Sequence, residues 1–172
     1  AIRAIWPRCD SSGICLYDNT ISTPFVGRSL ATIAEICVGF IIVKIVHIIL
    51  TDADNFIDYD LTFLKSFNNL SVLLPIISQI FCWIGITTKI PIYNAIEESL
   101  WALFGLSKFV TLFMLFNKLN NIENDNSKLK SIKFISFYGI LFSLAYVLFM
   151  VFVDVPMYVR RQSTLKKDDI LN

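Results

Sequence analysis

Residues 29–50 read SLATIAEICVGFIIVKIVHIIL, an apolar run in which Glu35 and Lys44 are the only acidic and basic side chains apart from His47. At a rise of about 1.5 Å per residue, a helix of this length covers about 30 Å, the thickness of the hydrocarbon core of a bilayer. A helix that is apolar on nearly every side is stable only where apolar material surrounds it. We therefore predict that this run crosses a membrane.

Three further runs of similar character follow, at residues 70–88, 95–116 and 132–153. The chain of 172 residues is 55% hydrophobic, has a mean hydropathy of +0.63 and carries 17% charged residues, against about 25% in a typical soluble domain. The alternative is a soluble protein with four buried helices, but a chain of this length has too few residues to cover them. The sequence predicts an all-α integral membrane bundle of four transmembrane helices, in contact with membrane lipids and with lipids bound to it.

Residues 29–158 form the predicted transmembrane domain, and a polar tail is expected over residues 159–172. Residues 1–28 contain Pro7, Gly13, Pro24 and Gly27, so this segment is too irregular to face lipid. We expect it to pack over one end of the bundle. Within it, the stretch CDSSGIC places Cys9 and Cys15 close enough for a disulfide, and two free thiols are the equal alternative.

The connection TTKIPIYN at residues 87–94 predicts a tight turn between the second and third spans. Proline cannot continue the preceding helix, because it lacks an N–H and its ring clashes with that helix, but it is well suited to begin the next one. Pro91 should therefore end one helix and start another, which makes the second and third spans antiparallel neighbours. Pro75, inside the second span, should kink its helix.

Each predicted span carries one stripe of polar or small residues when it is projected at about 100° per residue. An outward-facing charge at the centre of a bilayer costs about 2.5 to 3.5 kcal/mol on insertion scales, so these stripes should face protein. Lys44 lies opposite its stripe and is expected to reach toward the membrane surface. The stripes consist of Arg28, Thr32, Glu35 and Gly39; Asn68, Pro75, Gln79 and Cys82; Asn94, Glu97, Trp101 and Lys108; and Ser136, Gly139, Ser143, Tyr146, Met150 and Asp154.

The stretch NAIEESLWALFG at residues 94–105 places two adjacent carboxylates at the start of the third span. We predict a buried polar network near one end of the bundle, with Arg28 as its base. Its acids are Glu35, Glu97, Glu98 and Asp154, the last at an unspecified distance from the others. Such groups either hold helices together through hydrogen bonds worth about 0.6 to 2 kcal/mol each, or they form a proton path or ligand site.

Several classes of function have no support in the sequence. A net charge of +1, from 15 basic and 14 acidic residues, gives no electrostatic footprint for nucleic acid. The acidic stretch TDADNFIDYD at residues 51–60 lacks the glycine and the glutamate of a calcium loop. The single histidine, His47, is a poor basis for nucleophilic catalysis, and no recognised nucleotide or metalloprotease motif occurs. We therefore predict neither a metal nor a cofactor, and we lean against a catalytic activity of its own.

Two functional hypotheses remain. The first is a structural or accessory subunit of a larger membrane assembly, in contact with other membrane protein subunits. A respiratory-type complex of the mitochondrial inner membrane is the example considered. The second is a stand-alone membrane enzyme or proton-coupled carrier that uses Glu35, Glu97 and Glu98 as proton donors and acceptors.

Overall fold

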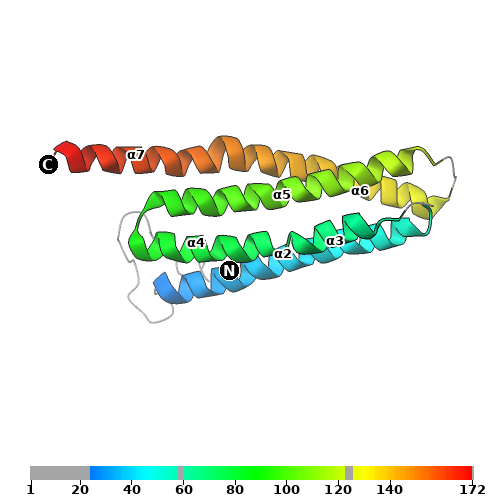
Figure 1. Ribbon diagram of the computed structural model, residues 1–172, viewed down its shortest axis with the longest axis horizontal. Helices are drawn as coiled ribbons and strands as arrows, with labels where there is room; N and C mark the ends of the chain where they lie inside the picture. Colours follow the sequence, from blue (N-terminus) through cyan, green and yellow to red (C-terminus); the bar gives the residue numbers. More distant parts are fainter. Residues whose placement is uncertain (1–23, 58–59, 123–125, 172) are drawn as a thin grey trace. The chain divides into compact units, whose positions relative to one another are not determined.

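The computed structural model describes residues 24–57, 60–122 and 126–171, and within these ranges all regular structure is helical. Four helices are long and apolar enough to cross a membrane: Val26–Asp54, Thr62–Thr88, Pro91–Asn120 and Ser127–Thr164. The predicted all-α, multi-pass membrane fold is therefore confirmed. In chain order the elements are α2 (Pro24–Asp54), α3 (Thr62–Leu70), α4 (Leu73–Thr88), α5 (Pro91–Asn120), α6 (Ser127–Phe149), the π-helix η2 (Met150–Asp154) and α7 (Val155–Leu171) (Figure 1).

The chain divides into two compact units, residues 1–38 and 39–172. In the first unit, the described residues are those that begin α2. Helix α2 starts at Pro24, five residues before the predicted start at Ser29. A proline is well placed there because the first N–H groups of a helix have no intrahelical partner. The rest of the predicted irregular segment, including Cys9 and Cys15, lies outside the described residues.

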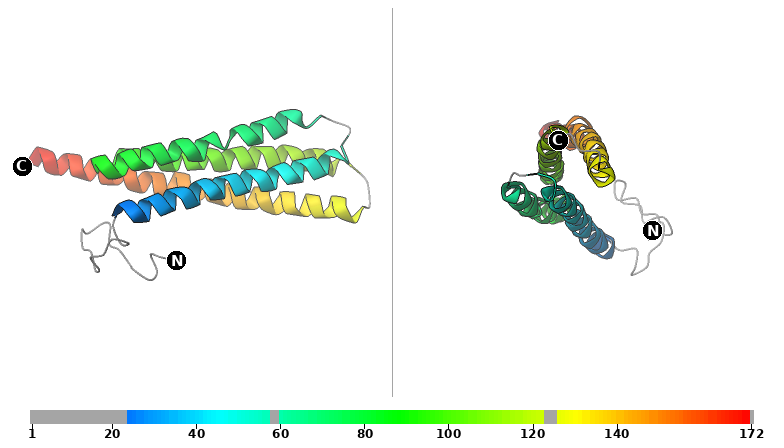
Figure 2. Two further views of the ribbon diagram at one scale, coloured as in Figure 1. Left: turned by 90° about the horizontal axis from the view of Figure 1, so that it is seen from below. Right: turned by 90° about the vertical axis from the view of Figure 1, so that its right-hand side faces the viewer.

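Helix α5 is the central element of the second unit. It contacts α3, α4, α6, η2 and α7 (Figure 2). One apolar cluster lies where α2 ends and α6 begins, and it includes the fully buried side chains Leu50, Leu115, Leu119 and Leu129. A second cluster joins Val43 of α2, Trp101, Ala102 and Phe104 of α5, and Met150 of η2. These contacts make α5 the helix against which the others pack.

The second span is longer than predicted and is interrupted. We placed its start near Leu70, but helix begins at Thr62, and α3 and α4 are separated by Ser71 and Val72. Pro75 has no N–H to donate to the Ser71 carbonyl four residues before it. Leu74 donates to that oxygen instead, at 3.1 Å. The missing N–H of Pro75 therefore interrupts the helix about one turn earlier, at Ser71 and Val72. Pro75 itself lies in the first turn of α4, where a proline is tolerated.

The turn between α4 and α5 follows the prediction. Lys89 adopts the left-handed conformation with φ of 58°, and Ile90 is extended. Pro91 is the first residue of α5. The prediction that this proline begins the third span is confirmed, and α4 and α5 are antiparallel neighbours (Figure 1).

The last helix continues beyond its predicted end at residue 153. The Val155 N–H donates to the Met150 carbonyl five residues back, the pattern of a π-helix. Such bulges relieve the clash and the lost hydrogen bond that a proline imposes on a helix, and Pro156 follows directly. The chain then remains helical as α7 to Leu171, where the sequence predicted a polar tail from residue 159.

Most of the described polar stripes face the interior of the second unit, as predicted. Asn68, Pro75, Gln79 and Cys82 are buried on α3 and α4. On α5 the buried members are Glu97, Trp101 and Lys108, and on α6 and η2 they are Ser136, Ser143 and Met150. Gly39 is also buried, and its Cα lies so close to Pro75 that an added Cβ would come within 2.9 Å of the proline ring. Small and polar residues at helix contacts are typical of membrane bundles.

Candidate functional site: a buried lysine between three helices

Lys108, near the middle of α5, is the most unusual side chain of the interior. It is only 3% exposed, and its Nζ donates to three oxygens of the α3 end. These are Asn68 Oδ1 at 2.6 Å, Ser71 Oγ at 2.5 Å and the Asn68 carbonyl at 3.3 Å. An ammonium group has three N–H donors, so each can be matched to one of these oxygens.

The break between α3 and α4 supplies these acceptors. In an unbroken helix the Asn68 carbonyl would accept from Val72 N–H. Val72 donates instead to the Asn69 carbonyl, at 3.3 Å. The Asn68 carbonyl is therefore available to side chains, and it accepts from Ser71 Oγ at 2.6 Å as well as from Lys108.

The cluster extends to a third helix. Asn68 Nδ2 donates to the Val43 carbonyl of α2 at 2.9 Å, so one side chain links α2 and α5 through α3. Lys108 Nζ also lies 4.8 Å from the centre of the Phe104 ring, a distance suited to a cation–π contact. Phe104 is in turn held edge-on against Trp101, with ring centres 5.7 Å apart. We call Lys108, Asn68 and Ser71 the lysine cluster.

Within the described part of the chain, no carboxylate lies within ion-pair distance of Lys108. Its positive charge is met by neutral oxygens and an aromatic face. A charge buried in this way is costly to desolvate, and removal of any acceptor would leave it worse solvated. The lysine cluster is therefore suited to fixing the break of α3 and α4 against α5 and α2.

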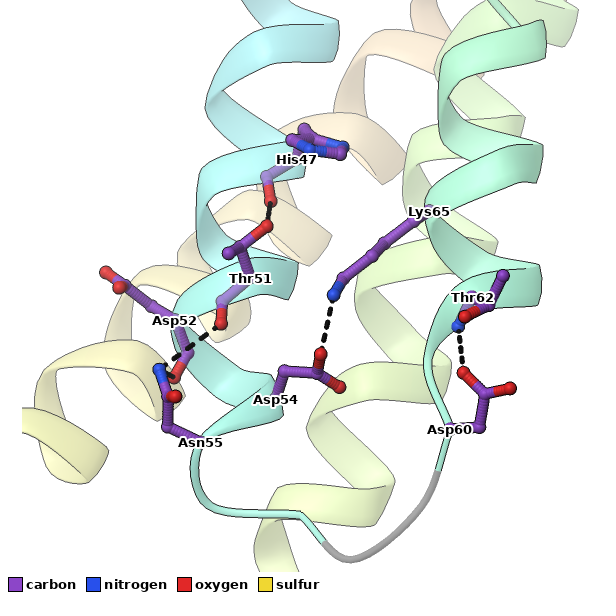
Figure 3. A network of polar contacts seen from close by, with 8 residues as sticks. All are labelled: His47, Thr51, Asp52, Asp54, Asn55, Asp60, Thr62 and Lys65. Carbon is purple, nitrogen blue, oxygen red and sulfur yellow. Dashed lines mark hydrogen bonds and ion pairs between the residues drawn. The ribbon is translucent and has the colours of Figure 1, made fainter.

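A second set of polar contacts surrounds the loop from α2 to α3 (Figure 3). Lys65 of α3 forms an ion pair with Asp54 of α2 at 2.6 Å. Asp60 Oδ1 accepts from the Thr62 N–H at 2.8 Å, and hydrogen bonding from the side chain and then the backbone of Thr62 holds the pKa of the Asp60 carboxyl below its usual value. Asn55 Nδ2 donates to the Asp52 carbonyl at 3.4 Å. These charged, solvent-accessible groups mark this end of the second unit as one that faces water.

Asp52 connects the same end to the start of α6. Its Oδ1 lies 3.1 Å from Lys128 Nζ, and both side chains are about half exposed. Next to Lys128, Asn126 begins α6 by accepting from the Lys128 N–H at 2.9 Å. Asp52, Asp54 and Asp60 of the acidic stretch are therefore used for ion pairs and a helix start. The described residues contain no group of three or more side chains placed to hold a metal ion.

Arg28 and Glu35, two members of the predicted buried polar network, lie in the first unit. Arg28 Nη2 donates to Glu35 Oε2 at 3.3 Å, and the side chains are 15% and 33% exposed. The two residues are seven apart, about two helical turns, so their long side chains can meet along one face of α2. They form a pair that is only partly buried.

Glu97, Glu98 and Asp154, the other three predicted members, lie in the second unit. Glu97 is 6% exposed, while Glu98 and Asp154 are intermediate. All three carboxylates act electrostatically on the hydroxyl of Tyr158 in α7. Three acidic groups therefore influence one tyrosine near the start of α5.

A groove of about 400 Å³ runs between α5 and the helix formed by α6, η2 and α7. Its lining is almost entirely apolar and includes Ala102, Leu106, Val147 and Val151. The π-helix borders it through Val151, which lies at the point where the helix is locally widened. Apolar grooves of this kind accept hydrocarbon chains far more readily than polar solutes.

Sequence reasoning placed Lys108 on the inward stripe of α5 but did not select it as a site residue, and it missed Ser71. The signal was present, because any ionisable side chain near the centre of a span is a candidate. Its acceptors were hidden because they depend on where α3 ends. Comparison of this chain with protein-family models, with curated proteins and with solved structures finds no match.

Proposed function

We propose that this chain is a structural or accessory subunit of a larger membrane protein assembly. The observation that carries the proposal is the lysine cluster, in which Lys108 is used to tie helices together. Its three donors meet oxygens of the adjoining helix break. The groove beside α5 is apolar, which suits lipid and offers no polar route to the cluster.

A respiratory-type complex of the mitochondrial inner membrane is the assembly that we propose to test first. The support is limited to the character of the chain: a small, Ile- and Phe-rich helical protein with no motif for a reaction of its own. Bound lipids and other membrane subunits are its proposed partners.

The test is native electrophoresis of membranes that contain the tagged full-length chain, after extraction in a mild detergent. The proposal predicts that the chain migrates in one large complex of defined size. Migration as a monomer or a small oligomer, under conditions that leave known complexes of the same membrane intact, would contradict it.

A second function, a proton-coupled carrier or enzyme using Glu35, Glu97 and Glu98, has one observation in its favour. Glu97, Glu98 and Asp154 all act electrostatically on Tyr158, and acidic groups at one end of a membrane bundle are typical of proton relays. Glu97→Gln separates the two functions. The variant removes the titrating carboxyl but keeps a side chain of the same size that can form hydrogen bonds. A carrier would therefore lose proton coupling, whereas a structural subunit would still assemble and its complex would stay active.

A further inference from the structure

Lys44 is a second lysine within a membrane-spanning helix, and its surroundings are the opposite of those of Lys108. It is exposed on α2, and no hydrogen bond or ion pair joins it to the part of the chain that the structure describes. The neighbours on the same face are Ile41, Ile45 and Ile48, which are 57%, 51% and 59% exposed. A single positive charge is therefore surrounded by an outward apolar surface.

The depth of Lys44 follows from the water-facing end of the second unit. Asp52 marks that end through its exposed ion pair with Lys128. Lys44 precedes Asp52 by eight residues, which is about 12 Å along the helix. An extended lysine side chain reaches about 6 Å from its Cα, so its ammonium group comes within about 6 Å of the level of Asp52 only at full extension. A helix directs its side chains toward its own N-terminus, which is away from Asp52, so the predicted reach of Lys44 to the lipid headgroups requires the side chain to be held fully extended against that direction.

Three exposed isoleucines around one charge resemble the centre of a protein–protein interface. A charge inside a bilayer is stabilised best by an opposite charge on a neighbouring helix, and removal of water and lipid headgroups strengthens that attraction. Lys108, which is buried, is instead surrounded by oxygens of this chain. No such oxygens are provided for Lys44 by the described residues.

We propose that the face of α2 formed by Ile41, Lys44, Ile45 and Ile48 docks a transmembrane helix of another subunit, and that this helix presents an aspartate or glutamate to Lys44. This inference rests on the proposed function and specifies the partner's chemistry. The carboxylate should lie about two to three turns from the end of its helix, at the depth of Lys44. The apolar contacts around the pair would exclude lipid from it.

The test places a photo-crosslinking amino acid at Ile48 in the full-length chain, in membranes of cells that make the assembly. Phe142 of α6, 74% exposed, is the matched control position. We expect a crosslink from Ile48 to one protein, at a peptide within a membrane span that contains Asp or Glu, and no equivalent crosslink from Phe142. Crosslinking to lipid alone, to a second copy of this chain, or to a span without a carboxylate would overturn the proposal.

Charge variants supply the second measurement. Lys44→Leu, which suits lipid better than lysine, should reduce the amount of chain in the native complex by about tenfold, the effect of about 1.4 kcal/mol. Lys44→Arg should keep most of it. Lys44→Glu should be absent from the native complex. Replacement of the partner's crosslinked Asp or Glu by Lys should restore Lys44→Glu to the complex.

The outcomes separate this inference from the proposed function. If the wild-type chain runs in a large complex and Lys44→Leu remains in it undiminished, the docking proposal fails and the subunit function stands. If the wild-type chain itself runs as a small species, the subunit function fails. A variant that misfolds is recognised by aggregation in size-exclusion chromatography in mild detergent, or by loss of its band on a denaturing gel if it is degraded, and the crosslink from the Ile48 position of the otherwise native chain then decides.

Discussion

Lys108 shows how one ammonium group is accommodated between membrane helices by neutral oxygens. Asn68 and Ser71 provide the acceptors because α3 ends where it does. Asn68 also donates a hydrogen bond to the Val43 carbonyl of α2. The stabilisation is mutual, because each side chain of the lysine cluster would be buried without a partner if another were removed.

Replacement of Lys108 by methionine should destabilise the folded chain by about 1 to 3 kcal/mol, the usual cost of leaving buried polar groups without a partner. Methionine keeps the length and the apolar stem of lysine but donates no hydrogen bond. Unfolding in detergent micelles, followed by circular dichroism, measures the change. Lys128→Met is the control, and it should cost less than about 1 kcal/mol because the Asp52 pair is exposed. Equal losses of stability in the two variants would show that the lysine cluster stabilises the fold no more than an exposed ion pair does.

Lys89 ends α4 in a backbone conformation that favours glycine, with φ of 58°. Its side chain is exposed, so replacement by glycine removes backbone strain without loss of packing. Lys89→Gly should raise the free energy of unfolding by about 1 kcal/mol, measured in the same micelles. Lys89→Ala retains the Cβ and should give no such gain. A loss of stability with glycine would contradict the assigned turn.

At the scale of helices, sequence and structure agree best where the signal is long apolar runs. Four spans are present, and Pro91 begins the third. The start of the second was missed because TFLKSFNN at residues 62–69 is amphipathic, with Lys65 and Asn69 among its polar members. Its buried positions are Leu64 and Asn68. An apolar-run criterion cannot detect a helix that is covered by protein on one side, whereas helical periodicity can.

The end of the fourth helix was missed for a different reason. We predicted that the helix ends near residue 158 because the residues after it are polar. Residues 159–171 contain no glycine or proline to stop the helix, and α7 continues through them. A change from apolar to polar composition marks where a helix leaves lipid, not where it ends. The π-helix before Pro156 was beyond sequence reasoning, because a proline can be accommodated by either a kink or a bulge.

The start of α3 is stabilised by the charge of Asp60, which accepts from the Thr62 N–H. A negative group is favourable at a helix N-terminus, and hydrogen bonding from the Thr62 side chain and then from its backbone lowers the pKa of this carboxyl from its usual 3.8. Because the folded-state pKa is the lower one, the stabilisation is fully present above the unfolded-state pKa and is lost as the pH falls through the folded-state pKa.

Asp60→Asn tests this contribution. The variant should be less stable than the wild type at neutral pH, and the difference should shrink to nothing as the pH falls through the folded-state pKa of Asp60. Denaturation of both proteins across an acidic pH series measures it. A difference that does not change with pH would show that the charge of Asp60 does not stabilise α3.

Close contact between α2 and α4 depends on Gly39. An added Cβ would lie 2.9 Å from Cγ and 3.1 Å from Cβ of the rigid Pro75 ring. Gly39→Ala should therefore cost about 1 to 3 kcal/mol, as overpacking does. Gly139→Ala is the matched control, because its nearest neighbour is the tip of the flexible Leu112 side chain, which can move aside. Equal stability of the two variants would contradict the close packing of these helices.

For the whole molecule, the sequence predicted the class of fold from one physical fact, the thickness of a bilayer. It predicted less of the candidate site. Of the five predicted network residues, Glu97, Glu98 and Asp154 act electrostatically on the same tyrosine, Tyr158, while Arg28 and Glu35 pair with each other in the first unit. Periodicity tells which face of a helix a residue occupies. Which residues on different helices meet depends on helix breaks and side-chain lengths.

The central claim is that the chain spans a bilayer and that the exposed apolar side chains of α6 face lipid, and cysteine accessibility along α6 tests it most directly. Ser131 and Leu141 are both exposed on α6, but Leu141 lies about 21 Å from the start of the helix at Ser127. Single cysteines at these two positions, in a chain whose own cysteines are replaced, would be treated with a water-soluble maleimide in opened membranes. The account predicts rapid labelling at position 131 and almost none at position 141 until detergent and denaturant are added. Equal labelling of both positions in the intact bilayer would contradict it.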